Sequence, residues 1–313
     1  KQFDFYAGEL QYANPYSSET NRPAVEHSRH YLGQFAGSER VYRNLLTEAA
    51  GNNPTLNFNK KFPGSSAVVT NGYDVPGAYT KSGFASITNA IKHASKYFAG
   101  DQWVLGDQAA LPADLPKLQQ DLTARYTADY IDVWRKYLKA GQVVPYASIS
   151  DAAKKLGINA GPESPVLGMM CLASQNTDSS EAISTAFQTL HKVVPPACST
   201  GYIGGNNADY MKSLAGLQVA LEQIGTQKPD PADPMVAAAS NSANMAKTSM
   251  IQLTQTLGVD QNAHLEGKIE QLLEAPIKYS DPLLRGLAPA ALNGKGAALC
   301  AEMRPLLGKY PFN

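Results

Sequence analysis

The chain has 313 residues, of which 43% are hydrophobic and 17% are charged, and its formal net charge is zero. This composition is typical of a folded globular protein, and the length suggests two packed units, or three, with a well-buried core. The zero net charge and the lack of a basic stripe with interleaved aromatic residues exclude the usual nucleic-acid-binding classes.

No obvious targeting or membrane-spanning segment occurs in the sequence. No run approaches the roughly 18 apolar residues that cross a bilayer. The opening stretch, KQFDFYAGEL, lacks the apolar centre of a signal peptide. Because the chain does not begin with methionine, we expect it to be a piece of a longer protein, and one that makes no membrane contact of its own.

The residues before Ala78 differ from those that follow. Residues 53–77 are rich in turn formers and contain one short run of β character, SAVVT, at 66–70. Most of the remaining sequence has helical periodicity. We therefore predict a mainly α protein, a multi-helix scaffold with a short mixed, loop-rich N-terminal segment. A boundary near Ala110 would separate a mixed unit, 1–110, from a helical domain, 111–313.

The stretch DVPGAYTKSGF is predicted to turn the chain into a helix. Pro76 followed by Gly77 is typical of a type II turn, in which the glycine takes a positive φ. Thr80 stands where a helix N-cap belongs. The apolar residues beyond it recur at steps of three and four, which indicates an amphipathic helix; they are Phe84, Ile87, Ile91, Ala94 and Phe98.

The clearest helix lies in the stretch PADLPKLQQDLTARYTADYIDVWRKYLKAG, residues 112–141. One apolar stripe runs along it, formed by Leu115, Leu118, Leu122, Tyr126, Tyr130, Trp134 and Leu138, and widened by Val133 and Tyr137. Arg125 with Asp129, and Asp132 with Lys136, are spaced as ion pairs on the outer face. Gly141 is the predicted stop. The aromatic stripe is interpreted as core packing rather than a cofactor site.

Further helices follow at shorter lengths. Ser150 is the predicted cap of a helix that ends at Gly157. Ser164 and Pro165 form a strong start signal for the next. One continuous helix is predicted over SSEAISTAFQTLHKVV, residues 179–194, and stops at Pro195 and Pro196. The next is predicted to close at Gly225, and after the break at 229–234 a further helix is predicted over 235–257.

The three cysteines are Cys171, Cys198 and Cys300, with no CxxC pair among them. Each could be a small buried hydrophobic residue. In an oxidising compartment, one pair could instead form a disulfide and leave the third thiol free. The spacing does not decide between these alternatives.

Motifs of the common enzyme classes are absent, because the chain has no GxxxxGK[ST], HExxH or GxSxG sequence. His27 and His30 are spaced along one helix face but lack an obvious third metal ligand. His191 and Cys198 form at most an unsupported nucleophile pair. The loop GYIGGNNADY could hold an anion at a helix start, but a plain loop with Asn207 as cap is favoured. We predict no metal and no cofactor.

One dipeptide offers an enzymatic alternative. Helical enzymes that cleave peptidoglycan use a glutamate next to a serine, and Glu163-Ser164 has this pattern. The chemistry would require Glu163 to lie in an apolar cleft. The structural interpretation is favoured, because Pro162 and Pro165 frame a turn and Ser164 caps the next helix. We therefore predict a protein that is not an enzyme.

Five segments, taken in order, resemble the IcmF-like proteins, the TssM subunits of the type VI secretion system. They are VPGAYTKSGF, DQWVLG, RYTADYIDVWRKYLKAGQVVPYASISDAAKKL, GPESPVLGMM and GKYPFN. The resemblance extends from about Ser38 to the end of the chain, and it is looser over 1–37. The positions that carry the family signature are Pro76, Gly77, Thr80, Gly83, Trp103, Tyr130, Trp134, Pro165, Pro311 and Phe312.

The resemblance implies a structural role in a trans-envelope secretion complex. The chain would be the largely helical periplasmic part of an inner-membrane protein of a Gram-negative bacterium, followed in the family by a β-rich domain. A TssJ-like lipoprotein would bind mainly to that β domain. A TssL-like inner-membrane subunit would bind regions outside this chain, and the protein would self-associate in the full complex.

Overall fold

The computed structural model describes residues 2–12, 21–34, 38–99, 115–227, 229, 233–258, 264–287 and 299–301. The chain divides into two compact units, one formed by Lys1–Ala49 and Ser86–Arg125, the other by Ala50–Ala85 and Tyr126–Asn313. The predicted boundary at Ala110 lies outside the described residues and stays a prediction.

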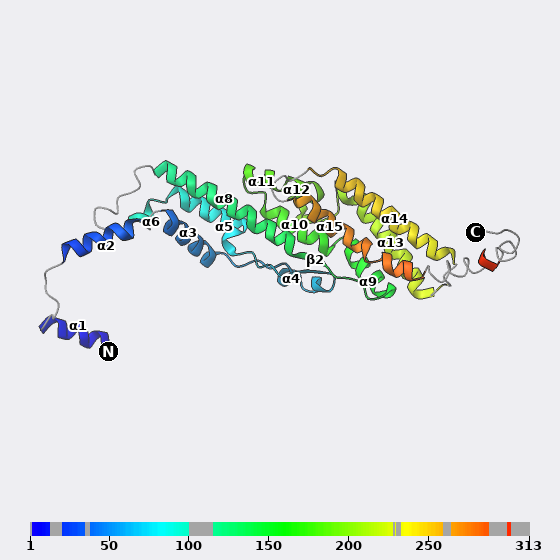
Figure 1. Ribbon diagram of the computed structural model, residues 1–313, viewed down its shortest axis with the longest axis horizontal. Helices are drawn as coiled ribbons and strands as arrows, with labels where there is room; N and C mark the ends of the chain where they lie inside the picture. The colour runs from blue at the N-terminus through cyan, green and yellow to red at the C-terminus, as the bar shows by residue number, and fades with distance from the viewer. Residues whose placement is uncertain are drawn as a thin grey trace, which may run out of the picture. The chain divides into compact units, whose positions relative to one another are not determined.

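Helices dominate the described chain, which confirms the predicted mainly α fold (Figure 1). They include α1 (Gln2–Tyr12), α2 (Arg22–Gln34), α3 (Ser38–Asn52), α4 (Phe58–Lys61), α5 (Lys81–Lys92), α6 (Lys96–Ala99), α8 (Leu115–Ala140), α9 (Ile149–Ala160), α10 (Pro165–Asn176), α11 (Glu181–Ala186), α12 (Gln188–Val193), α13 (Ala208–Gln227), α14 (Pro234–Gln255) and α15 (Leu265–Lys278). None of the described helices is both long enough and apolar enough to cross a membrane.

The first unit is built on α3, whose buried face consists of Val41, Tyr42, Leu45 and Ala49. At its edge, the Arg125 guanidinium lies over the Tyr42 ring, 4.3 Å from the ring centroid. Arg125 also forms an ion pair with Glu39, which in turn contacts Arg43 at 2.8 Å. These two arginines lower the pKa of the Glu39 carboxyl, Arg125 more strongly.

Two short strands, β1 (Val69–Asn71) and β2 (Gly141–Val143), form an antiparallel pair in which Asn71 faces Gly141. The predicted run SAVVT is therefore shifted, since its first part is a 3₁₀ turn, Ser65–Ala67. The Asn59 side chain explains the shift. It accepts a hydrogen bond from the Asn71 amide at 2.8 Å and donates to the Val69 carbonyl at 2.9 Å, which sets the strand at Val69–Asn71.

Helix α8 has the buried stripe predicted from its sequence. Within the second unit, Tyr126, Tyr130, Trp134, Tyr137 and Leu138 are fully buried. The outer pair Asp132–Lys136 is formed at 2.7 Å. Gly141 ends the helix as predicted, and a side chain there would lie 2.5 Å from the Met169 side chain.

In the rest of the second unit, α13 packs against both α9 and α14, and α15 packs against α14 and α12 (Figure 1). The predicted start of α10 is confirmed, because the Ser164 hydroxyl accepts a bond from the Leu167 amide and Pro165 occupies the first turn. The predicted continuous helix before Pro195 is wrong, since the chain breaks at Phe187 between α11 and α12.

The prediction for α9 is also wrong at both ends. Ser148, not Ser150, is its cap, and the Ser148 hydroxyl accepts a bond from the Asp151 amide at 3.2 Å. The helix passes through Gly157 and ends at Ala160, and a side chain at 157 would make an ordinary contact with Gln218 of α13 at 3.7 Å. Gly157 therefore does not stop the helix.

Candidate functional site

The VPGAYT turn contains the largest group of signature residues, and it lies against α8. After Pro76, which is extended, Gly77–Tyr79 form a 3₁₀ turn that leads into α5. The predicted positive φ at Gly77 is wrong, since the glycines with positive φ in the described chain are Gly64 and Gly205. Gly77 is required for space instead, because a side chain there would lie 1.8 Å from the Asn53 carbonyl oxygen.

Thr80 performs the predicted capping. Its hydroxyl accepts a bond from the Gly83 amide at 3.2 Å and donates to the Gly77 carbonyl at 2.8 Å. Gly83 also has a spatial requirement, since a side chain there would lie 2.2 Å from the same Gly77 carbonyl. The first turn of α5 is thus folded tightly onto the turn that precedes it.

Side chains of α8 hydrogen-bond to the next two carbonyls of the turn. The Tyr126 hydroxyl donates to the Ala78 carbonyl at 2.5 Å, and the Trp134 indole N–H donates to the Tyr79 carbonyl at 2.8 Å. With the Thr80 bond to Gly77, three successive carbonyls of the turn accept side-chain donors. A short polar backbone segment can therefore be buried against α8 without the cost of unpaired groups.

The C-terminus of α10 completes this junction through Asn176. The Asn176 side-chain oxygen accepts a bond from the Lys81 amide at 2.8 Å, and its main-chain carbonyl accepts one from the Tyr130 hydroxyl at 2.6 Å. Since α10 begins at Pro165, the helix extends from one signature position to a residue that holds the signature turn. We call this arrangement of turn, α8 and Asn176 the signature junction.

The tyrosines of the signature junction are held as protonated donors. Burial raises the pKa of the Tyr130 phenol to about 12, and it raises the pKa of the Tyr126 phenol further. Their rings pack at 5.9 Å, and Phe84 contacts both. The cluster is apolar apart from its paired hydroxyls, which indicates that these residues pack the core and do not form a catalytic site.

Six of the ten signature positions meet at the signature junction, and Pro165 starts the helix that reaches it. Trp103, Pro311 and Phe312 lie outside the described residues. Sequence reasoning missed Asn53 and Asn176, whose roles depend on contacts with residues far away in the chain. No local pattern marks either asparagine, so neither could be identified from its neighbours in sequence.

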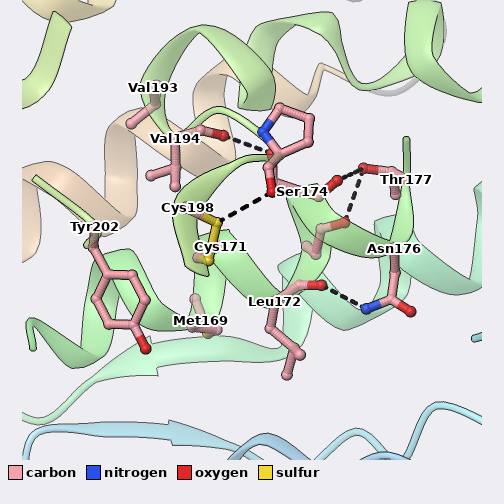
Figure 2. Close-up of a disulfide and its surroundings, with 12 residues drawn as sticks. Met169, Cys171, Leu172, Ser174, Asn176, Thr177, Val193, Val194, Cys198 and Tyr202 are labelled. Carbon is pink, nitrogen blue, oxygen red and sulfur yellow. Dashed lines mark hydrogen bonds between the residues drawn. A yellow bond between two sulfur atoms is a disulfide. The ribbon is translucent and has the colours of Figure 1, made fainter. Parts of the chain in front are cut away.

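A disulfide joins Cys171 of α10 to Cys198, with a Cα–Cα distance of 5.9 Å (Figure 2). Both residues are buried, and Cys300 is free and exposed. The Ser174 hydroxyl, one turn further along α10, donates to the Val194 carbonyl at 2.5 Å. Of the alternatives open from the sequence, one bridged pair with one free thiol is the arrangement formed.

The disulfide removes the thiol that a Cys198–His191 nucleophile pair would need. His191 instead contacts the Thr177 hydroxyl through its Nε2 atom at 2.9 Å. Burial lowers the pKa of His191, with Asp178 acting in the opposite sense. The structure thus contradicts the nucleophile pair.

Glu163 is an exposed residue on a cleft of about 660 Å³ whose lining also includes Lys61, Phe62 and Tyr202. A general acid of the glycosidase type needs an apolar, water-excluding environment, which an exposed carboxylate lacks. The Asn207 side-chain amide donates to the Val193 carbonyl at the end of α12 and to the Tyr202 carbonyl of its own loop. Within the described ranges, no three His, Cys, Asp or Glu residues are grouped as metal ligands.

Comparison with known proteins identifies relatives of one kind. A family model described as "IcmF-related: Intracellular multiplication and human macrophage-killing" matches residues 1–178, and so includes 1–37, where the motifs resemble the family less. The chain is 28% identical over 179 residues to the "Type VI secretion system component TssM1" of Pseudomonas aeruginosa, which covers 52% of this chain and 16% of that protein.

A solved structure described as "Type VI secretion system membrane core complex" contains a similar fold. The TM-score is 0.63 at 16% sequence identity, over 88% of this chain and 56% of that one. The chain thus spans about a sixth of the matched curated relative and about half of the matched structure. At this identity, the structural likeness shows a shared fold, and it extends beyond the part that the family model matches.

Proposed function

Because the chain belongs to the IcmF-related family, we propose that it is a non-catalytic, structural part of a type VI secretion membrane complex. The observation that carries the proposal is the family match over residues 1–178, with the fold of a membrane core complex chain extending over 88% of the sequence. The signature junction supports it, because its close approaches and paired carbonyls position helices and leave no reactive group.

We further propose that this part of the protein lies in the periplasm. The Cys171–Cys198 disulfide supports this placement, because disulfides form and persist in oxidising compartments and are rare in the cytosol. The partners proposed on the family resemblance are a TssJ-like lipoprotein and a TssL-like inner-membrane subunit, each bound mainly through regions outside this chain, together with further copies of the protein itself.

A pair of variants tests the structural role against the enzymatic one. Gly77→Ala should disrupt the signature junction, because of the 1.8 Å approach to Asn53, and should abolish both co-isolation of the complex and secretion. Glu163→Gln should leave both unchanged, since the Glu163 side chain is exposed and glutamine has nearly the same size. The measurement is co-isolation of tagged full-length protein with its complex, alongside a secretion assay.

The enzymatic alternative makes the opposite prediction for Glu163. A peptidoglycan-cleaving enzyme would release soluble muropeptides from purified sacculi, and Glu163→Gln would stop that release. Detection of such a Glu163-dependent product would contradict the structural role, however well the complex assembled.

A further inference from the structure

A second cleft, of about 610 Å³, lies beside the signature junction and is lined by three lysines. Lys60 and Lys61 come from the end of α4, and Lys81 is the first residue of α5. All three side chains are exposed. We call this feature the lysine cleft.

The lysine cleft is unbalanced in charge. Its lining contains no Asp or Glu. None of the three lysines forms an ion pair with another residue that the structure describes, whereas Lys136 and Lys155 pair with carboxylates at 2.7 and 2.8 Å. In a chain whose net charge is zero, three such ammonium groups around one concavity are a local concentration of positive charge.

Among the polar groups in and beside the lysine cleft, the three ammonium groups are the ones that would attract a negatively charged group. Asp74 lies alongside and keeps its negative charge, because the Asn57 amide that donates to it at 2.8 Å is neutral. The three lysines outnumber this neighbouring carboxylate. At the start of α5, the Lys81 amide is bonded to Asn176 and the Gly83 amide to Thr80, so these N–H groups are occupied. A negatively charged group in the lysine cleft would therefore meet lysine side chains rather than free backbone donors.

We propose that the lysine cleft is a docking site for an acidic segment of a partner protein, whose Asp or Glu side chains pair with Lys60, Lys61 and Lys81. Charge complementarity is the basis of the proposal. The concave shape favours an inserted segment over a flat lipid surface, and Pro54 and Leu56 offer apolar contact to the methylene groups of its side chains. Because it names the chemistry of a partner, this inference rests on the proposed function.

A binding titration tests the site with a defined probe. Fluorescent hexaglutamate is titrated into the 313-residue chain and into the triple variant Lys60→Gln, Lys61→Gln, Lys81→Gln. Loss of three charge pairs should weaken binding about tenfold, which equals about 1.4 kcal/mol at 25 °C. Added salt should weaken binding to the unmodified chain more than to the variant, because salt screens exposed pairs.

The matched control is a second triple variant with the same change in net charge. Lys139, Lys212 and Lys247 are exposed, belong to the same unit and do not line the lysine cleft. Their replacement by Gln should leave hexaglutamate binding within about twofold. Circular dichroism of both variants checks that the fold is kept, as expected for exposed lysines.

Each remaining result overturns the proposal. These are no binding of hexaglutamate, an equal loss in the control variant, equally tight binding of inorganic tripolyphosphate, or preferred binding to phosphatidylglycerol vesicles. The last two would assign the lysine cleft to phosphate groups or to a membrane surface. The titration needs no other subunit, so its failure is distinct from a failure of the co-isolation that tests the proposed function.

Discussion

At the scale of single residues, the signature positions act in two ways. The glycines let backbone segments approach each other closely, and the polar side chains hydrogen-bond to backbone groups. Gly77 and Gly83 are glycines because carbonyl oxygens lie within 1.8 and 2.2 Å of where a side chain would begin. Trp134 combines full burial with an N–H bond to the Tyr79 carbonyl. Changes at these residues should therefore affect folding first, and function only through it.

Gly77→Ala should destabilise the chain by roughly 3 kcal/mol or more, because the methyl group cannot fit without moving the Asn53 backbone. Urea unfolding followed by circular dichroism measures the loss. Gly72→Ala is the matched control, since no atom lies within 4 Å of its added carbon and its φ is not left-handed. Equal stability of the two variants would refute the steric role of Gly77.

Trp134→Ala should cost roughly 3–5 kcal/mol, the usual cost of truncating a core aromatic residue. Trp134→Phe should cost less, about 1–3 kcal/mol, because it keeps most of the bulk but leaves the Tyr79 carbonyl without its donor. Unfolding free energies of the two variants separate packing from hydrogen bonding. An unchanged midpoint for Trp134→Ala would contradict the core assignment of the α8 stripe.

At the scale of elements, α10 connects three features: the Pro165 helix start, the disulfide and the signature junction. It begins at Pro165, carries Cys171 in its middle and ends at Asn176, which holds the signature turn. Nearly all of its residues are buried, so the helix is apolar on every side, as expected of a central core helix. The disulfide adds a covalent link between α10 and the turn that follows α12.

Breaking the disulfide should lower stability by roughly 3.5 kcal/mol, the chain-entropy value for its separation of 27 residues. The variant is Cys171→Ser with Cys198→Ser, and Cys300→Ser is the control, which should change nothing because that thiol is free and exposed. In the Cys300→Ser chain, whose remaining cysteines are the buried bridged pair, thiol labelling after dithiothreitol should appear only in urea. Rapid labelling in the native state would show that the bridge is accessible.

At the scale of the whole molecule, local patterns predict the helical class and many helix positions, but long-range contacts lie beyond them. The α8 stripe and the Ser164–Pro165 start are predicted correctly, because each depends on neighbours within a turn or two. The φ of Gly77 is predicted wrongly, since the glycine is required by the nearby Asn53 carbonyl and not by a local turn type. The Cys171–Cys198 pairing and the role of Asn176 likewise depend on residues brought together only by folding.

The placement of the lipoprotein partner is a prediction about the longer protein. If a TssJ-like lipoprotein binds mainly to a β domain outside this chain, the 313 residues should bind it at least tenfold more weakly than a form that includes that domain. A titration with both forms measures the difference, and an unrelated lipoprotein serves as the control. Equal, tight binding by the 313 residues would place the partner surface on the helical part. In that case, the Lys60, Lys61 and Lys81 triple variant would decide whether the lysine cleft forms that surface, because only binding through the cleft would fall when those charges are removed.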